Sequence, residues 1–392
     1  MKKKPRQKIK EIAKAVLPEK TPPHLAGGIS MFINTTLVLQ LLLFLLYFMI
    51  YETLATAFGI GGWVLGTALA FLSITYISAI LIAAVRRGRL IRAYYRFAAL
   101  WFTFVPPLCG ACAAFVVIMN TAPLFKLMIL PAMAGVLCFG LATLATLYGI
   151  WNSGNLRVTK IGVRLPNLPV AWRGKRLVFL SDVHLGNVRT ESFMKRIVKK
   201  IQKLDPALVC IGGDLFDGVA CDPDVLVAPL RELRPPQGVY YVSGNHEYLR
   251  ASEQLIGAVA RAGVTVLRNQ NVDIDGVDLV GVDWNETDAL DDYVSIMGEL
   301  KIDPEKTNIL LKHVPENLDV AERFGVSLQL SGHTHHGQFW PITLISRFLY
   351  KEFDYGLHPF GKMMVYTSSG VGTEISPFRL GTKAELVEIT FE

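Results

Sequence analysis

Four long stretches of this chain contain no aspartate, glutamate, lysine or arginine, and they constrain its fold more than any other feature. They cover residues 29–51, 63–85, 97–119 and 127–150. An α-helix of roughly 20 apolar residues crosses the hydrocarbon core of a bilayer, whereas a helix buried in a soluble domain rarely runs so far without a charge. The sequence therefore predicts four transmembrane helices, and the third is expected to kink at Pro106 and Pro107.

Positive charge is distributed unevenly along the chain. Residues 1–150 carry a net charge of +11 and residues 151–392 a net charge of −4, which together give the +7 of the whole chain. Basic residues gather in an arm over residues 1–28, in the second loop between the predicted helices and directly after the fourth helix. Because cytoplasmic loops of membrane proteins are enriched in Lys and Arg, we expect a multi-pass protein of the cell membrane with its N-terminus and residues 151–392 in the cytoplasm.

The pattern changes at residue 151, where short β-rich runs alternate with helical stretches. Strands are expected at residues 177–181, 207–211, 239–243, 264–267, 278–282, 309–312, 327–331, 363–367 and 385–391, and helices at 191–203, 224–233 and 252–262. Such a series favours packed sheets flanked by helices, here a single α/β domain over residues 151–392. The five scattered cysteines do not form a disulfide framework.

Five of the expected strands end in side chains that can bind metal ions. The donors are Asp182, His184, Asp214, Asn245, His313, His333 and His335. Residues i and i+2 of an extended chain point the same way, so each D-x-H or H-x-H pair is expected to face one ion. Five strand ends in one sheet would bring all the donors to one edge.

Mixed imidazole and oxygen donors suit Mn²⁺, Fe²⁺ or Zn²⁺. Seven donors are too many for one ion but suit two ions that share a bridging carboxylate. Two ions about 3.5–4 Å apart can clamp the attacking and leaving oxygens of a phosphoryl displacement and make hydroxide available near neutral pH. The donor set therefore predicts a phosphoesterase with two divalent metal ions.

The order of these motifs resembles that of the calcineurin-like metallophosphoesterase superfamily, whose pattern is D-x-H, G-D-x-x-D, G-N-H-[ED], H and G-H-x-H. The resemblance implies an αββα four-layer sandwich with a binuclear metal centre. It assigns the first ion to Asp182, His184, Asp214 and His335, and the second to Asp214, Asn245, His313 and His333. Asp214 would then bridge the two ions.

The same resemblance suggests roles for residues outside the coordination shell. His246 would be the acid that protonates the leaving group or orients the phosphate, and Asp217 would hold His246 in its working tautomer. Gly244 and Gly332 would let the backbone approach the metals closely.

The flanking residues narrow the resemblance to a membrane-associated bacterial branch that includes a hydrolase of UDP-2,3-diacylglucosamine. The matching segments are Gly332-His-Thr-His-x-Gly-Gln, Pro341, Gly370-Val-Gly-Thr and Pro377-Phe-Arg379. Arg379 is expected either to contact a substrate phosphate or to form a surface salt bridge. His336 stands where that branch usually has glycine; it could be a spare ligand or a phosphate contact, but an exposed loop histidine is the preferred interpretation.

Residues 339–360 follow the last metal motif and are dense in apolar side chains. These are Phe339, Trp340, Leu344, Ile345, Phe348, Leu349, Tyr350, Phe353, Tyr355, Leu357 and Phe360. They could form an apolar lip that admits a lipid-linked phosphate, or a long loop that packs on its own domain, and the second interpretation is preferred.

A domain tethered to a membrane meets membrane substrates at high effective concentration. We therefore expect the bilayer as a partner and a phosphate ester or diphosphate of a lipid or lipid-linked sugar nucleotide as the substrate. Two alternatives are an inactive membrane sensor or scaffold, and a nucleotide or nucleic-acid phosphodiesterase. The net charge of −4 in the second half lacks the basic surface that nucleic-acid binding would need, so no nucleic acid is expected as a partner.

Overall fold

The computed structural model of this chain describes residues 28–218, 221–249 and 251–392. Residues 1–27 of the basic arm predicted over residues 1–28 therefore lie outside the described part of the chain. The chain divides into two compact units. One contains the residues up to Trp151 together with Ile375–Phe378, and the other contains Asn152–Glu374 and Arg379–Glu392.

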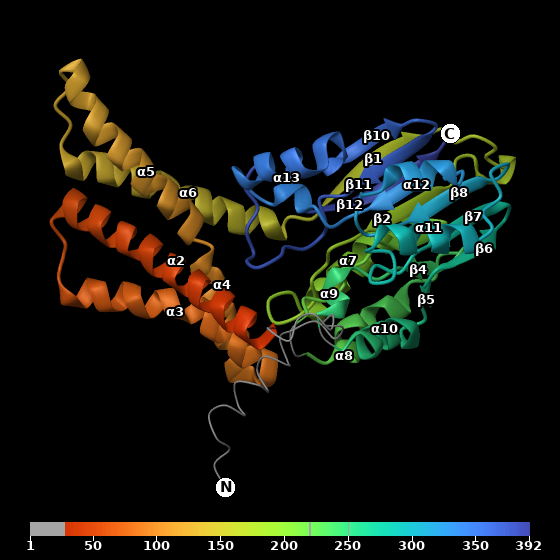
Figure 1. Cartoon of the computed structure of the whole chain (residues 1–392), viewed down its shortest axis with the longest axis horizontal. Helices are drawn as coiled ribbons and strands as arrows, with labels where there is room; N and C mark the ends of the chain where they lie inside the picture. Colours follow the sequence, from red (N-terminus) through yellow and green to blue (C-terminus); the bar gives the residue numbers. More distant parts are fainter. Residues whose placement is uncertain (1–27, 219–220, 250) are drawn as a thin grey trace, which may run out of the picture. The chain divides into compact units, whose positions relative to one another are not determined.

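The first unit is built from apolar helices (Figure 1). They are α2 (Gly28–Phe58), α3 (Trp63–Val85), α4 (Arg89–Phe102), α5 (Val105–Thr121), the 3₁₀-helix η1 (Ala122–Phe125) and α6 (Pro131–Gly154). Among the described residues they supply four segments long and apolar enough to cross a membrane, as the sequence predicts. Large side chains such as Val38 and Leu144 are 65% and 64% exposed, which is typical of a helix surface that faces lipid.

The third of these segments is longer than expected and is interrupted. It runs over Arg89–Phe125. The expected segment begins at residue 97, but helix α4 already begins at Arg89 and includes the arginines before residue 97. Helix α4 ends at Phe102 and α5 begins at Val105, with prolines in its first turn. Proline lacks an N–H group and is tolerated at that position, so the expected kink takes the form of a break between two helices.

The second unit contains, within the described residues, two six-stranded sheets. In spatial order the first sheet consists of β1 (Arg157–Val163), β12 (Glu385–Phe391), β2 (Arg176–Leu180), β3 (Leu208–Ile211), β4 (Val239–Tyr241) and β5 (Thr265–Val266). The second consists of β10 (Gly356–Phe360), β11 (Met363–Thr367), β9 (Leu328–Ser331), β8 (Thr307–Leu311), β7 (Val277–Gly281) and β6 (Gln270–Ile274). Strands β2, β3, β4 and β5 are parallel, as are β7, β8, β9 and β11.

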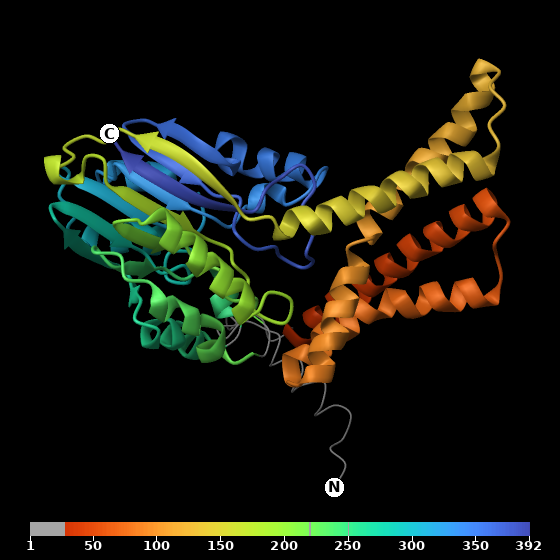
Figure 2. The same cartoon turned by 180° about the vertical axis from the view of Figure 1, so that it is seen from behind.

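Helices accompany both sheets (Figure 1 and Figure 2). The α-helices of this unit are α7 (Glu191–Leu204), α8 (Pro223–Val227), α9 (Asn245–Tyr248), α10 (Ser252–Arg261), α11 (Leu290–Glu299), α12 (Leu318–Arg323) and α13 (Ile342–Tyr350). The 3₁₀-helices are η2 (Val170–Trp172), η3 (Ala228–Glu232), η4 (His335–Gly337) and η5 (Lys351–Asp354). Strands β1, β6 and β10 and helices α9, α11, α12 and α13 are not predicted from the sequence.

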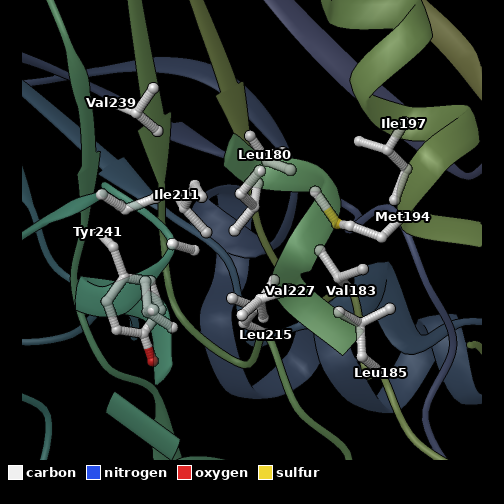
Figure 3. Close-up of a cluster of buried hydrophobic side chains, with 14 of the residues drawn as sticks. Leu180, Val183, Leu185, Met194, Ile197, Ile211, Leu215, Val227, Val239 and Tyr241 are labelled. Atoms are coloured by element: carbon white, nitrogen blue, oxygen red, sulfur yellow. The ribbon is translucent and has the colours of Figure 1, made fainter. Parts of the chain in front are cut away.

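Alternating side chains of the strands explain the layers. In β2, Val178 and Leu180 point to a core shared with α7, α8 and α10, whereas Leu177 and Phe179 point to the core between the two sheets. Figure 3 shows the first of these cores, where Leu180 and Ile211 of the first sheet lie near Met194 of α7. A third core joins the second sheet to α11 and α12. Strands that are buried on both faces have unbroken runs of apolar residues in the sequence. The expected αββα sandwich is confirmed.

Candidate metal centre

The seven predicted donors all follow the carboxyl ends of strands, but they come from two sheets. Asp182, His184, Asp214 and Asn245 follow β2, β3 and β4 of the first sheet, and His313, His333 and His335 follow β8 and β9 of the second. The expectation of a single sheet is therefore wrong. Apolar runs show that a strand is buried but not which strand it pairs with, and β2–β3–β4 and β8–β9 pair only within their own sheets.

The backbone at five of the seven donors is left-handed rather than extended. The φ angles are 54° at Asp182, 52° at His184, 49° at Asp214, 69° at His333 and 50° at His335. The expected i, i+2 geometry of the D-x-H and H-x-H pairs is therefore wrong, because both pairs lie in irregular backbone after the strand. Left-handed residues other than glycine cost about 1–3 kcal/mol each, and such strained turns are characteristic of functional sites.

One group of donors consists of Asp182, His184 and His335. One ligand atom from each lies within 4.8 Å of the others. Nε2 of His184 lies 3.0 Å from Nε2 of His335, which is 3.7 Å from Oδ1 of Asp182. All three side chains are buried. Three donors from two different sheets thus converge on one point.

A second group consists of Asp214, His313 and His333, again within 4.8 Å of one another. Asn245 joins this group, because its Oδ1 lies 3.2 Å from Nε2 of His313 and 2.9 Å from Nδ1 of His333. The other nitrogen of His313, Nδ1, lies 2.7 Å from the carbonyl oxygen of Gly212. That contact leaves Nε2 as the nitrogen that faces the group.

Asp214 lies between the two groups. Its Oδ2 is 3.9 Å from Nε2 of His184 in the first group and 3.3 Å from Nε2 of His313 in the second. Its other oxygen, Oδ1, accepts a hydrogen bond of 2.8 Å from the backbone N–H of His246. One carboxylate oxygen therefore faces imidazoles of both groups.

The protonation of the donors fits metal binding. Burial lowers the pKa of His184 well below its usual range, and burial likewise lowers the pKa of His335 and brings that of His333 to about 4. These imidazoles are neutral at pH 7 and offer free lone pairs, so few protons compete with a cation. Burial opposes ionisation of Asp214, but His313 and His246 hold its pKa well below the ordinary value.

One buried donor atom also lacks a partner. Oδ2 of Asp182 is buried and has no hydrogen-bond partner among the described residues. A buried carboxylate oxygen without a partner is costly unless a cation or another donor satisfies it. Together with the nitrogen and oxygen donors of both groups, this atom makes the residues fit one or two borderline divalent ions.

Two glycines of the motifs permit the close packing of the site. A Cβ atom at Gly244 would lie 2.3 Å from Oδ1 of Asp214, and one at Gly332 would lie 2.3 Å from Oδ2 of Asp182. A side chain at either position would displace a carboxylate. The sequence had predicted close approach of these glycines to metals, and the structure shows close approach to the carboxylates that would bind them.

Glu247 supports the site in a way that the sequence did not indicate. Its buried carboxylate accepts hydrogen bonds from the backbone N–H groups of Asp214, Phe216 and Gly244 at 2.7–3.1 Å. It therefore ties the loop after β3 to the loop after β4. Glu247 is part of the motif Gly-Asn-His-Glu, but the spacing of the motif does not tell whether this carboxylate binds metal or only supports the loops.

His246 lies beside the metal groups. Its ring centroid is 4.6 Å from that of His184, and its Nε2 lies 3.7 Å from Oε1 of the half-buried Glu374. Burial lowers the pKa of His246, but Asp214, Glu374 and Asp217 outweigh burial and raise it to about 10. The nearby His246 ring is the main reason that the pKa of Glu374 falls to about 2. Glu374 is not predicted from the sequence, although it stands directly after the Gly370-Val-Gly-Thr segment.

Asp217 is near His246, but no hydrogen bond joins the two side chains. One oxygen of Asp217 lies within 4.8 Å of ligand nitrogens of both His184 and His246. Nδ1 of His246 is buried without a hydrogen-bond partner among the described residues. Burial raises the pKa of Asp217 to about 7. Its role in orienting His246 stays a prediction.

Arg379 does not occupy a surface salt bridge, because its side chain is fully buried. Its Nη2 donates to the carbonyl oxygens of Ser369 and Gly372 at 2.5 and 2.8 Å, and lies 3.4 Å from Nδ1 of His335. A guanidinium saturated by backbone carbonyls has little capacity left for a substrate phosphate. The structure makes Arg379 a support for the side chain of His335, which Pro-Phe-Arg in the sequence could not indicate.

His336 is half-buried rather than exposed. Its Nδ1 lies 2.5 Å from Oδ2 of the buried Asp354, and its φ of 52° lies in the left-handed region that favours glycine. The pairing with Asp354 places His336 outside both groups of ligands. The expected exposed loop histidine is therefore a partner in a local polar contact.

Comparison with known proteins agrees with this geometry. Residues 175–337 match the family described as Calcineurin-like phosphoesterase. An uncharacterized metallophosphoesterase of Aquifex aeolicus is 33% identical over 259 residues, which are 64% of this chain and 98% of that protein. The chain belongs to the calcineurin-like metallophosphoesterase family, and the predicted resemblance to that family is confirmed.

Two further relatives are longer than the matched region. A Danio rerio protein named "Transmembrane protein with metallophosphoesterase domain" is 31% identical over 276 residues, 66% of this chain and 62% of that protein. An uncharacterized metallophosphoesterase of Campylobacter jejuni is 30% identical over 236 residues, 59% of this chain and 62% of that protein. The matches thus span 62% of the length of each of these two relatives.

Proposed function

We propose that this protein is a membrane-anchored phosphoesterase that works with two divalent cations, Mn²⁺, Fe²⁺ or Zn²⁺. Asp182, His184 and His335 would hold one cation, His313, His333 and Asn245 the other, and Asp214 both. The observation that carries the proposal is the position of Asp214 Oδ2, 3.9 Å from His184 Nε2 and 3.3 Å from His313 Nε2. A carboxylate oxygen shared between two donor groups can hold two cations close together, as two-metal phosphoryl transfer needs.

The cations, when bound, would neutralise charge on the phosphoryl oxygens and lower the pKa of a nearby water molecule. The remaining work falls to the chain's own side chains. His246 would donate a proton from Nε2 to the leaving oxygen. That nitrogen lies 3.7 Å from Oε1 of the half-buried Glu374. Glu374 favours the protonated ring through its negative charge, and Asp217 would hold the orientation of the ring.

The substrate class follows from the tether. Helix α6 ends at Gly154 and β1 begins at Arg157, so two residues separate an apolar helix from the first strand of the domain with the site. We infer hydrolysis of a phosphate ester or diphosphate on a lipid or lipid-linked sugar nucleotide. The Lys and Arg residues that flank the apolar segments support a cytoplasmic domain at the cell membrane.

The test is metal analysis and phosphate release with the full chain purified in detergent. Asp214→Ala should lose most bound metal and nearly all hydrolysis of lipid phosphates, because it removes the oxygen shared by both groups. Asp291→Ala, which changes an exposed aspartate of α11, should retain both and is the matched control. Retention of two metals and full turnover by Asp214→Ala would refute the bridging role. Good cleavage of soluble nucleotides with none of lipid phosphates would refute the substrate class.

A further inference from the structure

Helix α13 presents large apolar side chains to solvent. The exposed fractions are 60% for Leu344, 54% for Ile345, 84% for Phe348 and 63% for Leu349, and Trp340 just before the helix is 62% exposed. We call these five residues the α13 face. The preferred sequence interpretation, a loop that packs on its own domain, is wrong for the α13 face, although Phe353 and Phe360 of the same segment do pack on the core of the second sheet.

The orientation of α13 is the reverse of that of an ordinary surface helix. At about 100° per residue, Leu344, Ile345 and Leu349 fall with Phe348 on one side of the helix. Ser346 lies on the opposite side and is buried. Helices of soluble domains turn their apolar side to the core, so this one is built to meet an apolar surface outside the domain. Contiguous apolar patches of this kind mark interaction sites.

We infer that the α13 face is a membrane-docking surface that inserts into the interfacial region of a lipid bilayer. The same chain carries four segments able to cross a membrane, and two residues separate the last of them, α6, from β1, the first strand of the domain that bears α13. A bilayer is therefore an apolar surface to which the same chain is attached. The charged residues exposed on or beside it are Arg347, Lys351 and Glu352, a net positive set that suits anionic headgroups.

Polar contacts attach α13 to the loop that carries two proposed metal ligands. Ser346 Oγ donates to Oδ1 of Asp354, and the carbonyl oxygen of Asp354 accepts a 2.7 Å hydrogen bond from Thr334 Oγ1. Thr334 stands between His333 and His335. The ring of Tyr350, the last residue of α13, lies 6.2 Å from the ring of His333. A bilayer engaged by the α13 face would thus lie close to the candidate metal centre, at the level where lipid phosphates are found.

The experiment uses photocrosslinking, which does not depend on catalysis. The photoreactive residue p-benzoylphenylalanine replaces Phe348 in the full chain reconstituted into nanodiscs of phosphatidylcholine and phosphatidylglycerol. A second protein carries it at Leu290, which is 50% exposed at the start of α11, as the matched control. After irradiation, mass spectrometry should show about tenfold more lipid adduct at position 348 than at position 290, because an interfacial helix buries its apolar side chains among acyl chains.

Three outcomes would overturn the inference: crosslinks from position 348 to the chain's own apolar helices, crosslinks to a second copy of the chain, or equal lipid labelling at both positions. The same label at Leu344 keeps the test decisive if the first variant does not fold. The docking surface is independent of the proposed function. Lipid labelling at position 348 with no phosphate release would support the docking surface and refute only the catalytic proposal. Phosphate release without preferential lipid labelling would refute the docking surface and leave the catalytic proposal standing.

Discussion

A single methyl group at Gly244 should disable the metal centre without unfolding the domain. The φ angle of Gly244 is −116°, which any residue can adopt, so Gly244→Ala introduces no backbone strain. The new Cβ would nevertheless lie 2.3 Å from Oδ1 and 2.6 Å from the backbone nitrogen of Asp214. Real Cβ atoms essentially never lie within 3.0 Å of such neighbours, so Asp214 must move by at least about 0.7 Å, several times the tolerance of about 0.2 Å in metal–ligand distances.

We expect the affinity of Gly244→Ala for Mn²⁺ or Zn²⁺ to fall by about 10–100-fold or more, the range typical of disturbed support around metal ligands. Metal content is measured after dialysis against a series of buffered metal concentrations, together with thermal unfolding in detergent. The matched control is Gly298→Ala in α11, where the nearest atom to the new Cβ is 3.9 Å away. The control should bind metal normally, and it should be slightly more stable because alanine favours helix. Unchanged metal affinity in Gly244→Ala would refute the assignment of Asp214 as a ligand.

Other residues give predictions with distinct measurements. His246→Ala should lower turnover by about 10²–10⁴-fold with metals retained, because the ring acts as an acid outside the coordination shell; loss of metal would contradict that role. His246 is protonated below its pKa of about 10, which Asp214, Glu374 and Asp217 raise against the opposing effect of burial, so turnover should fall as pH rises through that pKa. Glu374→Gln should move this limb of the pH–rate profile to lower pH, and an unmoved limb would argue against the contact. Arg379→Met should lower the free energy of unfolding by about 3 kcal/mol, since the carbonyls of Ser369 and Gly372 lose buried partners; a variant as stable as the parent in a denaturant titration would disprove that support.

The apolar helices and the donor residues could be predicted because each rests on a local pattern. A run of 23 uncharged residues such as 63–85 predicts helix α3 (Trp63–Val85) with the same limits. Likewise, Asp214 or His313 at the end of an apolar strand can be recognised without knowing the partner of that strand. Edge elements such as β6 (Gln270–Ile274) were missed because exposed polar residues interrupt the alternation that would mark them as a strand.

Long-range contacts decided the roles that local patterns left open. Arg379 is one guanidinium in a loop in the sequence, and only the packing of residues 369–372 around it makes it a buried support of His335. Glu374 becomes a partner of His246 because two loops more than a hundred residues apart meet. The outward orientation of the α13 face likewise depends on tertiary packing, because the domain buries Ser346 on the other side of the helix.

The sequence by itself determined that this chain has four helices fit for a bilayer and a set of imidazole, amide and carboxylate groups at strand ends. Charge-free length and strand-end chemistry are properties of neighbouring residues. Only the tertiary structure decided that the donors come from two sheets, that five of them have left-handed backbone, and that Asp214 Oδ2 lies between two histidines 3.9 and 3.3 Å away. These features depend on distances between segments far apart in the chain, which are set by how the two sheets and their loops pack.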